Sequence, residues 1–187
     1  MKKYVTELIE TINAVAATCE EKFNINSGGC CYFAYLVARE LDKRKIKYKL
    51  AIEDWTFSKK FCKTNRLKAR RALKSRQSYV DGNSLVNCNH FTLMVGGELV
   101  NYESSWGSEV ILISYVNSED INWIYKTGRW NDFYKRKNNP TVERMVVKAF
   151  DKYEKAIQKR NKKERSVYSS EESLLCPLSR SDKSLLM

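Results

Sequence analysis

The sequence is poor in the features that mark several common classes of protein. Its 187 residues include a single histidine, and no apolar run approaches the roughly 20 residues that cross a bilayer. The opening segment Met1-Lys2-Lys3 leads into an amphipathic pattern and not into the apolar core of a signal peptide. We therefore expect a cytoplasmic protein without a membrane partner.

Paired cysteine motifs are also missing. The sequence has six cysteines, but none of them form the C-x-x-C pairs of common zinc sites. Without an export signal, these thiols are expected to be reduced. A zinc site built from Cys88, His90, Cys62 and either Cys30 or Cys31 is an alternative, although its spacing resembles no standard finger. The sequence thus predicts neither a metal nor another cofactor.

Positive charge, in contrast, is abundant. The formal net charge is +12, which indicates an acidic partner, nucleic acid or a strongly solvated surface. No glycine-rich phosphate loop and no RNA-binding motif accompanies this charge. The densest basic segment has no acidic residue, and its candidate contacts to an acidic partner are Lys59, Lys60, Lys63, Arg66, Lys68, Arg70, Arg71, Lys74 and Arg76.

Hydrophobic periodicity predicts one α+β domain over residues 1–160, large enough to bury a core. Period-3.6 and period-2 patterns alternate along it. They predict helices over 3–21, 30–43 and 140–159, and strands over 46–53, 90–95, 98–103 and 110–116. Residues 122–139 are aromatic but aperiodic and are expected to form a loop and a short helix. Residues 161–187 are basic and then serine-rich, which predicts a disordered tail.

The segment around Cys30 carries the main chemical signal. Gly28 and Gly29 break the chain just before Cys30, and helical apolar spacing begins at that cysteine. The first turn of a helix offers free N–H groups and partial positive charge, which favour a thiolate. Cys30 is therefore a candidate nucleophile, whereas Cys31 is expected to be structural.

A nucleophilic cysteine needs a base, and His90 is the one imidazole available. A two-residue turn at Gly96-Gly97 would place residue 90 across from 103 and Thr92 across from residue 101. His90, Asn101 and Glu103 would then share one face of the hairpin. Asn101 is the candidate that orients the imidazole, and Glu103 is the alternative third residue.

These two motifs resemble the papain-like cysteine peptidases, in particular their transglutaminase-core branch. The similarity lies in G-G-C-C-Y-F-A-Y-L, with Phe33 and Ala34 three and four positions after Cys30, and in H-F-T-L-M-V-G-G-E-L-V-N, which runs from His90 to Asn101. Small uncharacterised phage proteins have a similar pattern. The resemblance covers about residues 24–103. It implies a papain-like α+β fold, in which a nucleophile-bearing helix packs on a small antiparallel sheet and amphipathic helices lie at both termini.

The resemblance also implies roles. Cys30 would be the nucleophile, His90 the base and Asn101 the orienting residue. Papain-like enzymes place a glutamine six positions before the nucleophile to help the cysteine N–H bind an oxyanion; here Asn24, a shorter amide, holds that position.

Two functions are consistent with these features. The first is a thiol-dependent hydrolase or acyl-transfer enzyme that acts on an amide bond of a peptide or protein, as a peptidase, deamidase or transamidase. The alternative is a catalytically degraded scaffold that binds nucleic acid or an acidic protein through residues 59–76.

Overall fold

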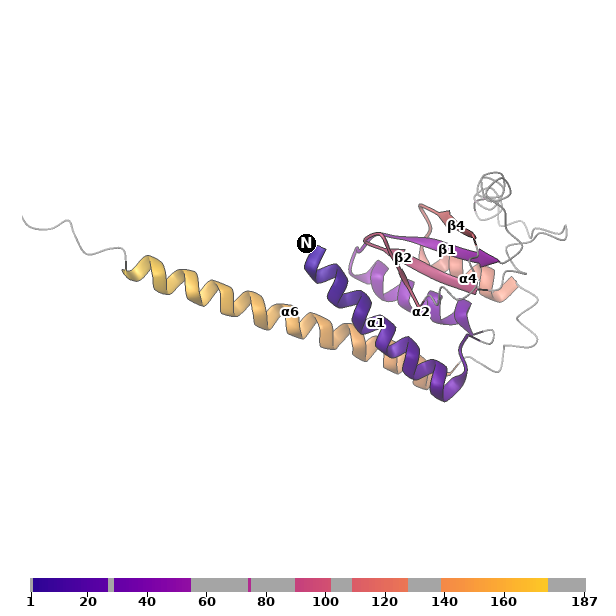
Figure 1. Ribbon diagram of the computed structural model, residues 1–187, viewed down its shortest axis with the longest axis horizontal. Coiled ribbons are helices and arrows are strands. Elements are labelled where there is room, and N and C mark those ends of the chain that lie inside the picture. The colour runs from indigo at the N-terminus through magenta and orange to yellow at the C-terminus, as the bar shows by residue number, and fades with distance from the viewer. Residues whose placement is uncertain are drawn as a thin grey trace, which may run out of the picture. The chain divides into compact units, whose positions relative to one another are not determined.

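Helical and strand segments alternate along the chain much as the hydrophobic periodicity predicts. The computed structural model describes residues 2–26, 29–54, 74, 90–101, 109–127 and 139–174 (Figure 1). Its elements, in chain order, are α1 (Lys2–Phe23), α2 (Cys30–Lys43), β1 (Tyr48–Asp54), β2 (His90–Val95), β3 (Glu98–Val100), β4 (Glu109–Ile113), α4 (Ser118–Thr127) and α6 (Pro140–Leu174). The predicted α+β class is confirmed.

The strands form one antiparallel sheet in the order β3-β2-β1-β4. The hairpin β2–β3 closes through the predicted two-residue turn, because Val95 pairs with Glu98. Gly96 and Gly97 have φ angles of 61° and 100°, a backbone region in which glycine lacks the steric cost of other residues. The strand β3 ends at Val100, three residues earlier than expected.

The helix α2 is the central element of the core. It contacts both β2 and α4, and all the residues of its predicted apolar stripe are buried: Cys30, Phe33, Ala34, Val37, Ala38 and Leu41. The facing sheet residues belong to the same hydrophobic cluster and include Leu50, Ile52, Phe91 and Leu93. Burial of such side chains contributes about 1.5–3 kcal/mol each, so packing fixes α2 against the sheet.

Glu40 is a buried charge at the C-terminal end of α2. It is 2% exposed and forms ion pairs of 2.7 Å with Lys43 and with Arg44. Burial alone raises the pKa of Glu40, but these two cations outweigh it and hold the pKa below its ordinary value. The guanidinium of Arg44 also lies 4.8 Å from the ring centre of Phe150, which connects α2 to the first part of α6.

The start of α6 follows its sequence signals, whereas its end does not. Asn139 caps the helix by accepting a 2.8 Å hydrogen bond from the Thr141 N–H, and Pro140 occupies the first helical position, where its fixed φ angle suits the helix. The helix continues to Leu174, so residues 161–174 are helical where the composition predicts a disordered tail. Lys, Arg, Glu and Gln are strong helix formers, and an existing helix extends at little cost.

The chain divides into two units, Met1–Tyr153 and Glu154–Met187. This boundary lies seven residues before the expected end of the domain at residue 160. The first unit contains the sheet with α1, α2, α4 and the first part of α6; the second contains the rest of α6. Within the described ranges, no helix combines the length and apolar character needed to cross a membrane.

Candidate active site

Cys30 is the first residue of α2, and the chain enters this helix through a tight approach. A side chain at Gly29 would place its Cβ 2.9 Å from the carbonyl oxygen of Ile25. The carbonyl of Gly29 accepts the first helical hydrogen bond, from the Phe33 N–H, at 2.9 Å. Cys30 is 0% exposed. Its sulfur therefore lies at the positive end of a helix and away from water, which strengthens electrostatic effects on it.

His90 begins β2, and its ring is close enough to the Cys30 thiol for the two groups to interact. The fold thus brings the single histidine of the sequence to the thiol at the start of α2. The ring nitrogen Nε2 lies 2.7 Å from the backbone carbonyl oxygen of Asn101. Because a carbonyl oxygen can only accept, Nε2 carries a proton, and Nδ1 is left to accept the proton of the Cys30 thiol.

Asn101 therefore meets His90 through its backbone and not through its side chain, which differs from the role that the resemblance implies. Its amide side chain donates to Asn26 Oδ1 at 3.1 Å, and its N–H donates to Asn13 Oδ1 at 2.8 Å. Asn101 also has a φ of 53°, a left-handed conformation that asparagine tolerates better than most residues. The two amides hold this conformation and aim the carbonyl at the ring.

Asn24 closes the end of α1. Its N–H donates to the Glu20 carbonyl at 2.8 Å, its φ is 52°, and its side chain is exposed. An exposed cap residue is poorly suited to stabilise an oxyanion at the buried Cys30, so the geometry gives that expected role no support. Asn26, two residues later, is the amide that joins the network around His90.

Glu53 is a residue of this site that the sequence patterns do not indicate. It pairs directly with His90 between β1 and β2, and it is 7% exposed. Its charge acts on the imidazole. Finding it requires knowledge that β1 lies beside β2, and the hairpin motif contains no such information.

The pKa of His90 is set by opposing effects. Burial alone lowers it, but the hydrogen bond and charge of Cys30, the Asn101 carbonyl and the charge of Glu53 together raise it above its ordinary value. The protonated ring therefore stabilises the fold at pH values below the pKa that the histidine has in the unfolded chain. That stabilisation is lost as the pH rises through the higher pKa of the folded state.

The other buried thiols lack this environment. Cys31 lies 4.0 Å from the carbonyl oxygen of Ile121, and its thiol donates to it. Burial raises the pKa of the Cys19 thiol to about 11. Cys19, Cys30 and Cys31 are all buried thiols, so the interaction with His90 is what distinguishes Cys30.

Several predicted residues lie outside the described part of the chain: Glu103, Cys62, Cys88 and, with the exception of Lys74, the basic residues of 59–76. Lys74 is helical and exposed. Among the residues that are described, no three His, Cys, Asp or Glu side chains are grouped to hold a metal ion. Comparison of the chain with protein-family models, curated proteins and solved structures finds no match.

Proposed function

We propose that this protein is a papain-like cysteine hydrolase or acyltransferase that acts on an amide bond of a peptide or protein. The interaction between Cys30 and His90 carries the proposal, because it joins a helix-start thiol to an imidazole whose Nε2 is fixed by the Asn101 carbonyl. A reduced thiol is required, which agrees with a cytoplasmic location.

The groups allow a balanced acyl transfer. The Cys30 proton moves to Nδ1 of His90, the resulting thiolate attacks the amide carbon, and the backbone N–H of Cys30 stabilises the oxyanion. The C–N bond then breaks, and His90 gives its proton to the departing amine. In the second half, water or another amine attacks the thioester, His90 accepts its proton, and that proton returns to the sulfur.

Selective alkylation of Cys30 tests this proposal, because the chain contains two matched thiols. The variant carries Cys62→Ser, Cys88→Ser and Cys176→Ser, which leaves three thiols. In it, iodoacetamide is expected to label Cys30 at least about tenfold faster than Cys19 or Cys31 at pH 7. Peptide mass mapping over time measures the three rates. Since all three thiols are buried, equal rates would show that His90 does not activate Cys30 and would refute the proposal.

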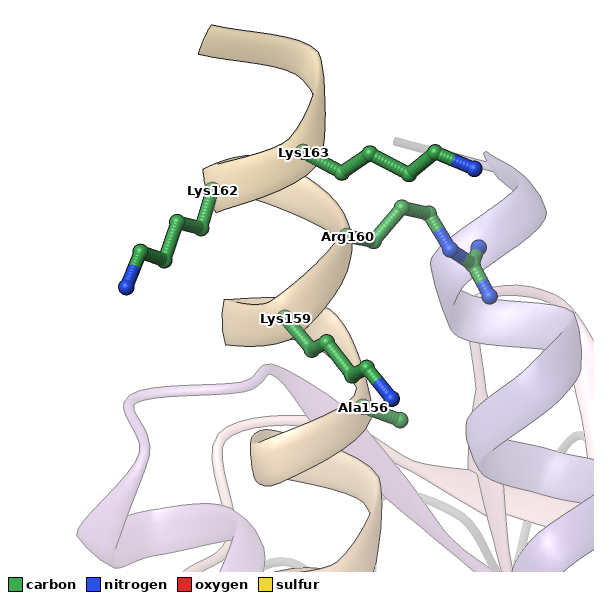
Figure 2. A pocket seen from close by; sticks show the side chains of 5 residues that line it. All are labelled: Ala156, Lys159, Arg160, Lys162 and Lys163. Carbon is green, nitrogen blue, oxygen red and sulfur yellow. The ribbon is translucent and has the colours of Figure 1, made fainter. Parts of the chain in front are cut away.

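A second candidate function, nucleic-acid binding, is favoured by a basic surface in the second unit. Within residues 155–163 of α6, five of nine residues are basic and none is acidic. Figure 2 shows four of these basic side chains around a surface pocket on this helix, which Lys159, Arg160, Lys162, Lys163 and Ala156 line.

The spacing of the exposed lysines suits a phosphate backbone. Lys155, Lys159, Lys162 and Lys163 lie at i, i+4, i+7 and i+8, which places them on one side of the helix. We call these four residues the α6 lysine face. Residues 154–163 include no aromatic side chain for base stacking, so the surface fits the phosphates of a duplex better than a single strand.

Replacing the α6 lysine face by glutamine is expected to weaken binding to a DNA duplex of about 20 base pairs at least tenfold. It should also reduce the slope of log K against log salt by about 3.6, or 0.9 for each lost phosphate contact. Fluorescence anisotropy over a salt series measures both. Glutamine at Lys22, Lys47, Lys49 and Lys126, which are also exposed, removes the same charge from the first unit as a control. If the two variants lost affinity equally, the loss would reflect net charge alone and would contradict a binding surface on α6.

A further inference from the structure

Glu53 is a carboxylate buried in the interior of the sheet. Its strand, β1, lies between β2 and β4, and the register sets Glu53 opposite His90 on one side and Val110 on the other. A carboxylate that is 7% exposed costs free energy unless positive charge or hydrogen bonds compensate for it. The imidazole of His90, when protonated, is a cation placed beside it.

The described groups that act on the His90 ring are all negative or electron-rich. They come from three elements: Cys30 from α2, Glu53 from β1 and the carbonyl of Asn101 after β3. Val110, which faces Glu53 from β4, is uncharged. This environment favours the imidazolium over the neutral ring, against the effect of burial.

We propose that Glu53 is a positioning residue of this site, whose buried carboxylate keeps His90 in its charged form during acyl transfer. This role rests on the function proposed for Cys30 and His90. Glu53 itself neither takes nor gives a proton.

The chemistry explains why a second negative group would matter. The Cys30 thiolate stabilises the imidazolium only before attack. Its negative charge moves to the oxyanion when the sulfur attacks, and it passes to the departing nitrogen when the C–N bond breaks and the thioester forms. Glu53 takes no part in these bond changes and remains beside His90 throughout. Its carboxylate can therefore hold the proton on His90 until the departing nitrogen accepts it.

The single histidine makes a direct test practical, since one imidazole resonance reports His90 without assignment. The titration is followed by proton NMR in a Cys30→Ala protein, in which the thiolate no longer contributes. There, Glu53→Gln is expected to lower the pKa of His90 by about one pH unit. Glu98→Gln, which removes one exposed charge from the same sheet, should leave the titration unchanged. An unchanged titration in folded Glu53→Gln would overturn the inference.

Two further measurements cover the case in which Glu53→Gln fails to fold. Glu53→Asp keeps the negative charge but moves it farther from His90, so the pKa of His90 should fall by less than one unit. In the Cys30→Ala protein, the pKa of His90 should therefore be higher with Glu53 intact than with Glu53→Asp. An equal pKa in these two proteins would also overturn the inference, because the position of the carboxylate would then have no effect on the ring.

These readings separate the inference from the function on which it rests. The titration needs neither substrate nor a reactive thiol, whereas the alkylation experiment does not depend on Glu53. A lowered pKa in Glu53→Gln together with unselective alkylation would retain the charge interaction and reject the enzyme. Selective alkylation of Cys30 together with an unchanged titration in Glu53→Gln would retain the enzyme and reject the role of Glu53.

Discussion

Replacing His90 by alanine is expected to slow alkylation of Cys30 by about 30-fold at pH 7. The imidazole is the described group that can accept the thiol proton, and Cys30 is among the groups that raise its pKa, which makes the ring a better proton acceptor. An ordinary thiol is only a few per cent ionised at neutral pH, so loss of the base should reduce the reactive fraction by roughly that factor. The rate constant for iodoacetamide, measured by mass mapping, gives the effect.

The pH profile provides the sharper form of this prediction. In the wild-type protein, the rate should change little around pH 7, because transfer of the thiol proton to His90, and not its loss to solvent, supplies the nucleophile. In His90→Ala, it should rise about tenfold per pH unit until the thiol ionises, as an unassisted thiol does. Cys19 and Cys31 serve as controls in the same sample, and their rates should not respond to the substitution. Parallel profiles for the two proteins would show that His90 is not the base.

Local patterns predict the two halves of this site well. Helical spacing and the preceding glycine predict the start of α2 at Cys30, and the structure begins the helix there. Alternation about Gly96-Gly97 predicts the two-residue turn, and the register confirms it. Both features depend on interactions between residues near in sequence, so a sequence contains enough information to specify them.

The connections between distant segments are different. Asn101 directs its carbonyl to His90 because Asn13 of α1 and Asn26 before α2 bind its N–H and amide. Glu53 reaches His90 because β1 lies next to β2. Neither contact leaves a periodic signal, since each is fixed by the packing of whole elements.

Helix ends show the same contrast. Asn117 and Asp120 cap the start of α4 reciprocally, with side-chain hydrogen bonds of 2.9 and 3.0 Å. The loop and short helix predicted for the aromatic segment are expected to begin at residue 122. The Asn117–Asp120 cap lies before that residue, so α4 begins earlier, at Ser118. The apolar stripe of α6 ends near Ile157, whereas the first helix-breaking residue after it is Pro177, three residues beyond Leu174, so the helix is longer than the stripe predicts.

Gly29→Ala is expected to lower the free energy of unfolding by roughly 2 kcal/mol and to reduce the reactivity of Cys30. Gly29 has φ −92° and ψ −1°, which alanine can adopt, so the cost comes from space and not from backbone conformation. The added Cβ would lie 2.9 Å from the oxygen and 3.2 Å from the Cα of Ile25. Both are backbone atoms, so relief requires a shift of the chain that leads into Cys30, and overpacking of this kind costs about 1–3 kcal/mol. Urea unfolding at constant m-value measures the change.

Gly96→Ala is the matched comparison, because its Cβ would meet a side chain, Val5, and not the backbone. Val5→Ala should therefore recover part of the stability lost in Gly96→Ala, apart from the strain of a φ of 61°. No side-chain substitution at Ile25 should recover Gly29→Ala, since the close contacts are with the Ile25 backbone. If Gly29→Ala changed stability by less than about 0.5 kcal/mol, or if Ile25→Ala restored it, the tight entry to α2 would not fix Cys30 beside His90.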